Sequence, residues 1–133
     1  MAEYFDTNVV VAVIFPGSTN KLDARRRWSG AAGEAFIINH GIAEVYRILT
    51  GPLRMTPKVS IELVGEVLRR FKVVDMARSD YVAVLEDVAK KNLSGPIVYD
   101  ALHAHGARNV GATKLHTYNK RHFLIVAPDL NVV

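Results

Sequence analysis

Short apolar segments alternate with helical patterns along almost the whole chain of 133 residues. Between these short apolar segments, apolar residues recur every three to four positions, as in an amphipathic helix. Strands that alternate with helices in this way usually form a parallel sheet with helices on both faces. We therefore predict an α/β fold with a mostly parallel central sheet of about five strands, helices on both faces, and a single domain over residues 1–133. The five predicted strands are Glu3 to Phe5, Ala35 to Ile38, Lys72 to Val74, Gly111 to His116 and Leu124 to Ala127.

The predicted helices are delimited by capping residues, glycines and prolines. The clearest one runs from Thr56 to Phe71, because Thr56 is a good N-cap, Pro57 suits the first helical position, and apolar residues then recur every four positions. The others are predicted from Asn20 to Ala31, from Gly41 to the Gly51-Pro52 stop, from a cap at Ser79, from Gly95-Pro96 to about Arg108, and for one turn from Asn119 to Phe123.

The Val-rich segment from Val9 to Phe15 is ambiguous on local grounds. Its β-branched residues favour a strand, whereas Asp6 or Thr7 could cap a helix. Pro16 and Gly17 end the segment in either case. It is also the longest wholly apolar run, and it is far shorter than the roughly 18 residues of a membrane-spanning helix.

Composition excludes several kinds of site. The chain has no cysteine, so it has no disulfide, no thiolate metal site and no cysteine nucleophile. Its N-terminus carries acidic residues where a secretory signal would be basic, so we expect a cytoplasmic protein without a membrane segment. The net charge is +4, and basic residues cluster at several points. The candidates for binding RNA phosphates are Arg25, Arg26, Arg27, Lys120 and Arg121. For any single cluster taken alone, the solvated face of a helix is the favoured explanation.

Three carboxylates and one amide are expected near one edge of the sheet. Asp6 follows the first predicted strand and Asn119 follows a later one, while Glu44 and Asp100 lie on helices that could face the same edge. Apolar residues flank Glu44 and Asp100, so burying them would be costly without a cation or hydrogen-bond donors. Oxygen ligands without cysteine select Mg²⁺ or Mn²⁺, and such a site suits phosphodiester hydrolysis.

The order and spacing of these residues resemble those of PIN-domain ribonucleases, and within that family the VapC-type toxins of toxin–antitoxin pairs. The resemblance rests on Asp6-Thr7-Asn8, on the stretch from Asn39 to Thr50, on the stretch from Tyr99 to Ala104, and on the stretch from Thr117 to Phe123. It implies a PIN-like fold, a helix directly after Asp6, and a metal-dependent endoribonuclease. It also implies metal ligands at Asp6, Glu44 and Asp100, a fourth site position at Asn119, supporting roles for Thr7, Asn8 and Thr117, a homodimer, and a small antitoxin as partner.

Three other interpretations stay open at this point. Asn119 stands where many PIN domains have Asp, so the chain could be a catalytically weak or inactive RNA-binding or assembly module. Histidines could form a zinc site, since His40 and Glu44 are four residues apart, but no further ligands follow at metal spacing. An aspartate after the first strand also occurs in phosphatases and phosphoacceptor domains, yet Asn8 replaces the second Asp that the phosphatase pattern needs.

Overall fold

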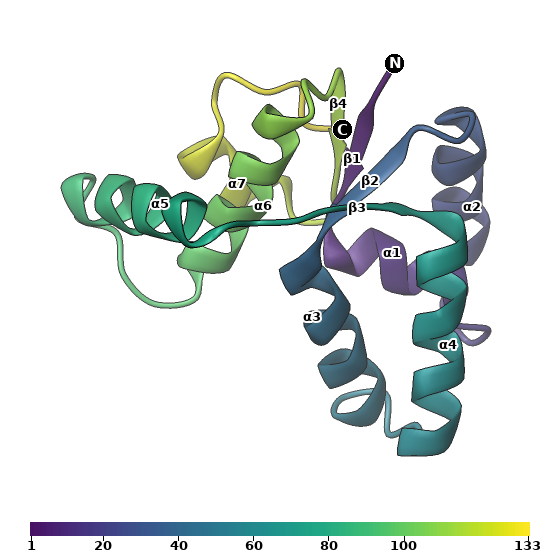
Figure 1. Cartoon of the computed structure of the whole chain (residues 1–133). Helices are drawn as coiled ribbons and strands as arrows, with labels where there is room; N and C mark the ends of the chain where they lie inside the picture. The colour runs from purple at the N-terminus through teal and green to yellow at the C-terminus, as the bar shows by residue number, and fades with distance from the viewer.

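A computed structural model describes the whole chain, residues 1–133, and is built around a four-stranded parallel sheet (Figure 1). Strand order in the sheet is β3-β2-β1-β4, and each neighbouring pair is parallel. The predicted α/β fold with a parallel sheet is therefore confirmed, with four strands instead of about five. The strands are β1 (Glu3–Phe5), β2 (Ala35–Ile38), β3 (Lys72–Val74) and β4 (Lys114–His116).

Seven helices connect and cover the strands. The Val-rich segment forms α1, and seven of its eight residues are buried, which explains an apolar run without an exposed polar face. Thr56 caps α4 as predicted, accepting a hydrogen bond from the backbone N of Val59 at 3.2 Å. No helix has the length and apolar character needed to cross a membrane. The helices are α1 (Thr7–Ile14), α2 (Lys21–Gly30), α3 (Asn39–Thr50), α4 (Pro57–Arg70), α5 (Arg78–Lys90), α6 (Ile97–Asn109) and α7 (Lys120–Val126).

The predicted strand from Leu124 to Ala127 is wrong, because Leu124 to Val126 belong to α7 and Ala127 is the C-cap of this helix. Phe123 and Val126 are buried, whereas Leu124 and Ile125 are 63% and 49% exposed. Buried positions three apart fit a helix face and do not fit the alternation of a strand.

The place beside β4 is taken by the last residues of the chain. Leu115 and Val132 form a parallel bridge, and the backbone N of Leu115 donates to the carbonyl oxygen of Asn131 at 2.9 Å.

A second, smaller correction concerns α5, whose N-cap is Ala77 and not Ser79. The carboxylate of Asp80 accepts from the backbone N of Ala77 at 2.8 Å and so fixes an earlier start.

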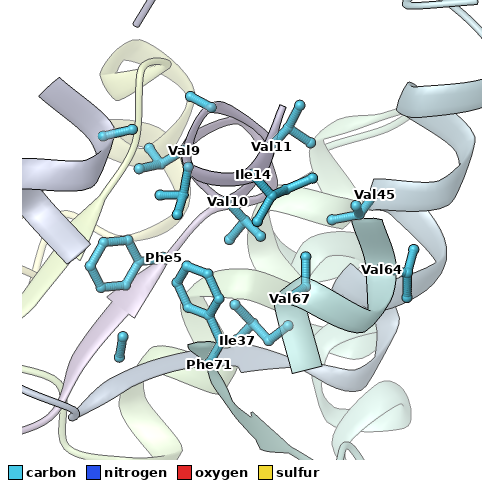
Figure 2. Packing of buried hydrophobic residues seen from close by; sticks show 14 of the residues in the cluster. Phe5, Val9, Val10, Val11, Ile14, Ile37, Val45, Val64, Val67 and Phe71 are labelled. Atoms are coloured by element: carbon cyan, nitrogen blue, oxygen red, sulfur yellow. The ribbon is translucent and has the colours of Figure 1, made fainter. Parts of the chain in front are cut away.

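The sheet separates two hydrophobic cores. Side chains alternate along β1, so Phe5 enters the core formed with α1, α2, α3 and α4, while Tyr4 enters the core formed with α5, α6 and α7. Each large apolar side chain fully buried in this way contributes about 1.5–3 kcal/mol of transfer free energy. Figure 2 shows the first core, where Phe5, Val10, Ile37, Val67 and Phe71 pack together.

Helix α6 lies directly on the sheet at Gly106. A Cβ atom built on Gly106 would overlap with Cγ2 of Ile38 and would lie 3.3 Å from Cε2 of Tyr4. The absence of a side chain at Gly106 therefore allows the close approach of α6 to β1 and β2. Because α6 also carries Asp100 and His103, this approach sets their position relative to the ends of the strands.

Candidate functional site

The candidate site lies at the carboxyl ends of the parallel strands. Asp6 follows β1, Asn39 and His40 begin α3 directly after β2, and Thr117 follows β4. Figure 1 shows α1 and α3 leaving the sheet at the same end. Ligands of open α/β sheets bind at this edge, and the polar residues predicted from sequence gather there.

Asp6 is held in place through both of its carboxylate oxygens. Oδ1 accepts from the backbone N of Thr7 at 2.8 Å, and Oδ2 accepts from the hydroxyl of Thr117 at 2.8 Å. The backbone N of Asp6 donates to the carbonyl oxygen of His116 at 2.9 Å, which links the residue to β4. The carboxylate also caps the N-terminus of α1, where the helix dipole favours a negative charge.

Glu44 reaches the same place from α3 and is held by His103. Its Oε1 lies 2.7 Å from Nε2 of His103 and accepts from the hydroxyl of Thr7 at 3.3 Å. The other ring nitrogen of His103, Nδ1, lies 2.6 Å from the hydroxyl of Tyr4, and that hydroxyl accepts from the backbone N of Ile38 at 3.2 Å. His103 is 1% exposed, so this chain of hydrogen bonds is inside the protein. Helix α6 thereby connects β1, β2 and α3 through one imidazole.

The charges in this cluster affect one another strongly. Burial alone would lower the pKa of His103, but its hydrogen bond to Glu44 and the negative charges of Asp6, Glu44 and Asp100 outweigh burial and raise it. Burial acts to raise the pKa of Glu44, and the hydrogen bond and charge of His103 more than offset this, so the pKa of Glu44 is lowered. Glu44 is therefore ionised at neutral pH.

Asp100 has a different environment from Glu44. Burial, followed by the negative charge of Asp6, raises the pKa of Asp100 above its ordinary value. Its Oδ2 lies 3.2 Å from Nδ1 of His122, and the same ring nitrogen lies 2.7 Å from Nδ2 of Asn119. The backbone N of Asn119 donates to the hydroxyl of Thr117 at 2.9 Å. Asn119 is thus tied both to the threonine that holds Asp6 and, through His122, to Asp100.

The supporting residues divide into two groups. Thr7 and Thr117 donate to the carboxylates of Glu44 and Asp6, as described above. Asn8 instead accepts from the backbone N of Tyr118 at 3.3 Å and fastens the turn after β4 to α1. Asn8 therefore supports the site indirectly, because its side chain holds the backbone of Tyr118.

The arginines of α2 are partly used within the fold. Arg25 donates from Nε to the carbonyl oxygen of Val13 at 3.2 Å. Arg27 donates from Nε to Asp23 at 2.9 Å. Arg26 is exposed and has no hydrogen-bonding or ionic partner. Phosphate binding by these three residues stays a prediction. Arg26 is the only one of the three whose guanidinium makes no hydrogen bond within the chain.

Lys120 and Arg121 begin α7 immediately after Asn119 and are exposed. Neither makes a side-chain hydrogen bond or an ion pair within the chain. Both positive charges therefore follow a site residue directly in the chain. Phosphate binding there is also still a prediction.

Two histidines at the site were not assigned a role from the sequence. The sequence assigns no specific role to His103, which is the hydrogen-bond partner of Glu44. The spacing of Asp100 and His103, three residues apart on one helix, was the available signal that both face the same way. For His122, which contacts Asp100, the sequence offered only its position beside basic residues.

The oxygen donors of Asp6, Glu44, Asp100 and Asn119 are of the type that Mg²⁺ and Mn²⁺ prefer. No group of three or more acidic and histidine side chains is arranged closely enough to surround a metal ion. Magnesium does not need such a cage, since it commonly binds one or two carboxylates and keeps several waters. The charge of Asp6 already raises the pKa of Asp100, so a cation near this pair would relieve repulsion. The donor set therefore fits a hydrated divalent cation.

Comparison with known families identifies the fold. The sequence model of the PIN domain family matches residues 4–127, which includes every residue of the site. The chain belongs to the PIN domain family. No curated protein matches this PIN domain in sequence.

Solved structures with the same fold include VapC toxins and their complexes. The VapC20 toxin of Mycobacterium tuberculosis, described as cleaving the sarcin–ricin loop, aligns with a TM-score of 0.72 and 16% identity over 86% of this PIN domain and 87% of that chain. The DNA-bound VapBC2 complex of Rickettsia felis gives a TM-score of 0.72 and 19% identity, and the DNA-bound VapBC complex of Salmonella typhimurium gives 0.73 and 21%. The last two alignments each cover 100% of this PIN domain and 98% of the other chain. At these identities the likeness concerns the fold.

Proposed function

We propose that this PIN domain is a Mg²⁺- or Mn²⁺-dependent endoribonuclease that acts as the toxin of a VapC-type toxin–antitoxin pair. The observation that carries the proposal is that, at the carboxyl edge of the sheet, His103 lies 2.7 Å from Glu44 and 3.7 Å from Asp6. Asp100, on the same helix as His103, is near enough for the charge of Asp6 to raise its pKa. A structural domain has no need to hold three acids around one buried histidine. Membership of the PIN family and the shared fold with VapC toxins support the same function.

Asp6 and Asp100 are the proposed metal ligands, with Glu44 as the third. A divalent cation bound there would neutralise charge on the scissile phosphate and supply a nucleophilic water. The chain's own residues prepare this site: Thr117 and the backbone of Thr7 hold the Asp6 carboxylate, and each oxygen of that carboxylate keeps a lone pair free.

His103 and Asn119 have positioning roles in this proposal. His103 fixes the carboxylate of Glu44 from behind, because its ring lies in the core and not in solvent. Asn119 offers an amide oxygen without a full charge, which can orient a water molecule. Holding the groups in place before the substrate arrives reduces the entropic cost of the reaction.

The cleavage assay uses a panel of single-stranded and structured RNAs with Mg²⁺, with Mn²⁺ and with EDTA. We expect cleavage that needs the metal, and loss of cleavage in Asp6→Asn and Asp100→Asn with an unchanged circular dichroism spectrum. Wild-type activity in either variant would refute the site. RNA binding without cleavage under every condition would favour the alternative, a PIN-like RNA-binding or assembly module, for which Asn119 is the best support.

The proposal extends to two protein partners, a small antitoxin and a second copy of the chain. Two of the solved relatives are toxin–antitoxin complexes. Apolar side chains on α4 stay exposed and offer contact area, among them Ile61 at 60% and Leu68 at 50% exposure. Sedimentation at micromolar concentration tests the homodimer, which a strict monomer would exclude.

A further inference from the structure

A groove of about 560 Å³ opens beside the acidic cluster, between α3 and the start of α6. Glu44 forms part of its wall, and Tyr99, which also lines it, immediately precedes Asp100. The groove is therefore continuous with the candidate site. Its volume lies within the range of about 300–1,000 Å³ that is typical of small-ligand clefts. The lining residues are His40, Ala43, Glu44, Arg47, Pro96 and Tyr99.

Two aromatic rings stack in this groove. The rings of His40 and Tyr99 lie at 8° to each other with their centroids 5.3 Å apart. Tyr99 is 46% exposed, and its hydroxyl makes no hydrogen bond within the chain. The tyrosine thus contributes little to the core and presents an aromatic surface next to the carboxylates. Flat aromatic side chains in such positions are what unpaired bases stack on.

Arg47 supplies the positive charge of the groove. It lies seven residues after His40 and three after Glu44, so all three share one face of α3. Its exposed guanidinium makes no hydrogen bond and no ion pair with the rest of the chain. A planar guanidinium that is free in this way is suited to bidentate contact with a phosphate.

We propose that this groove binds one unpaired nucleotide of the RNA adjacent to the cleaved phosphodiester, with the base on Tyr99 and His40 and a phosphate on Arg47. The inference rests on the proposed ribonuclease function and adds to it a nucleotide-binding subsite formed by Tyr99, His40 and Arg47. A base within a duplex already has both faces stacked and cannot reach Tyr99 without being unstacked. A base bound in this groove must therefore be unpaired. The stacked pair and the free arginine favour a nucleotide over a peptide as occupant.

The test measures binding of a fluorescently labelled single-stranded RNA by anisotropy, in EDTA and again in Ca²⁺, with a duplex of equal length for comparison. We expect the single strand to bind more tightly than the duplex. Tyr99→Ala should weaken single-strand binding by about fivefold or more, and Tyr99→Phe should stay within about twofold of wild type. The matched control is Tyr46→Ala, since Tyr46 is an exposed tyrosine of α3 that does not line the groove.

A second variant tests the phosphate contact. Arg47→Gln should reduce the slope of log affinity against log salt concentration by about 0.7, the value for one phosphate of a single strand. Arg69→Gln is the control, because Arg69 lies at the end of α4 that enters β3, at the opposite edge of the sheet. Both residues are exposed, so Arg47→Gln remains informative even if a Tyr99 variant does not fold.

The outcomes separate this inference from the proposed function. No wild-type binding of the single strand in either condition would overturn the groove assignment. Equal losses of RNA affinity in Tyr99→Ala and Tyr46→Ala would also overturn it, as would wild-type RNA binding in both Tyr99→Ala and Arg47→Gln. A protein partner would then be the remaining occupant of the groove. Binding that depends on Tyr99, together with absence of cleavage in Mg²⁺ and Mn²⁺, would support the groove while refuting the ribonuclease.

Discussion

Replacing Gly106 by alanine tests how α6 is positioned over the site. The added Cβ would overlap with Cγ2 of Ile38, which is fully buried, and would press on the ring of Tyr4 at 3.3 Å. Ile38 is β-branched and has little rotamer freedom, so its methyl group cannot swing away. The helix and the sheet must therefore move apart.

The size of the effect follows from two opposing contributions. Overpacking a core typically costs 1–3 kcal/mol, and the upper part of this range applies because the overlap lies between two fixed elements. The higher helix propensity of alanine compared with glycine offsets about 1 kcal/mol of this cost. We therefore expect the free energy of unfolding to fall by about 2 kcal/mol, which corresponds to a decrease in Tm of about 6–10 °C for a chain of this size.

Urea unfolding followed by circular dichroism measures this change. Gly30→Ala is the matched control, because Gly30 ends α2 with no atom within 4 Å of its added Cβ, and it should be neutral or stabilising. In an Ile38→Ala background the cost of Gly106→Ala should shrink, since the overlapping methyl group is gone. A Gly106→Ala variant as stable as wild type would refute the close packing of α6 on β2.

The remaining predictions concern the site itself. His103→Leu should lower the free energy of unfolding by about 2–4 kcal/mol, because the half-buried Glu44 loses its donor. Because the pKa of His103 is raised in the folded state, its contribution to stability is fully present below about pH 6.5 and is lost as the pH rises through the folded-state pKa. In urea unfolding from pH 5 to 9, the free energy of unfolding of the wild type should therefore decline in a way that the variant lacks. The pKa of Asp100 is also raised, so its ionisation at pH 7 destabilises the folded state. Asp100→Asn should therefore raise Tm at pH 7 while cleavage is lost. A lower Tm would contradict the burial argument. Asn119→Asp should tighten Mg²⁺ binding at neutral to alkaline pH and less at acid pH, where protons compete; equal affinities by calorimetric titration at two pH values would place residue 119 outside the reach of the metal.

How far the sequence predicts the fold depends on whether the signal is local. The boundaries of α4 are local, because Thr56 and Pro57 mark its start and the four-residue spacing marks its buried side. The Val-rich α1 has no such signal, since burial on all sides hides the helical period, and only the family resemblance decided between helix and strand. In α7 the run from Leu124 to Ala127 satisfies strand propensity, and packing of Phe123 and Val126 against the core overrides it.

The candidate site was predictable only in part for the same reason. Asp6 follows from the general rule that polar residues after parallel strands gather at one edge. His103 does not, because its partners Glu44 and Tyr4 lie 59 and 99 residues away in sequence, and no local pattern reveals them. The arginines of α2 appeared equivalent, yet hydrogen bonds occupy Arg25 and Arg27 and leave Arg26 free.

The pairing of the first strand with the last has a consequence for synthesis on the ribosome. β1 lies between β2 and β4, and Phe5 is in register with His116. Thr117, whose hydroxyl holds the Asp6 carboxylate, is added to the growing chain 111 residues after Asp6. A nascent chain therefore lacks one neighbour of β1, and one hydrogen-bond donor to the Asp6 carboxylate, until residues 114–117 have been synthesised. If the proposed ribonuclease depends on the Asp6 carboxylate, we expect any nascent chain that stops before Thr117 to be inactive.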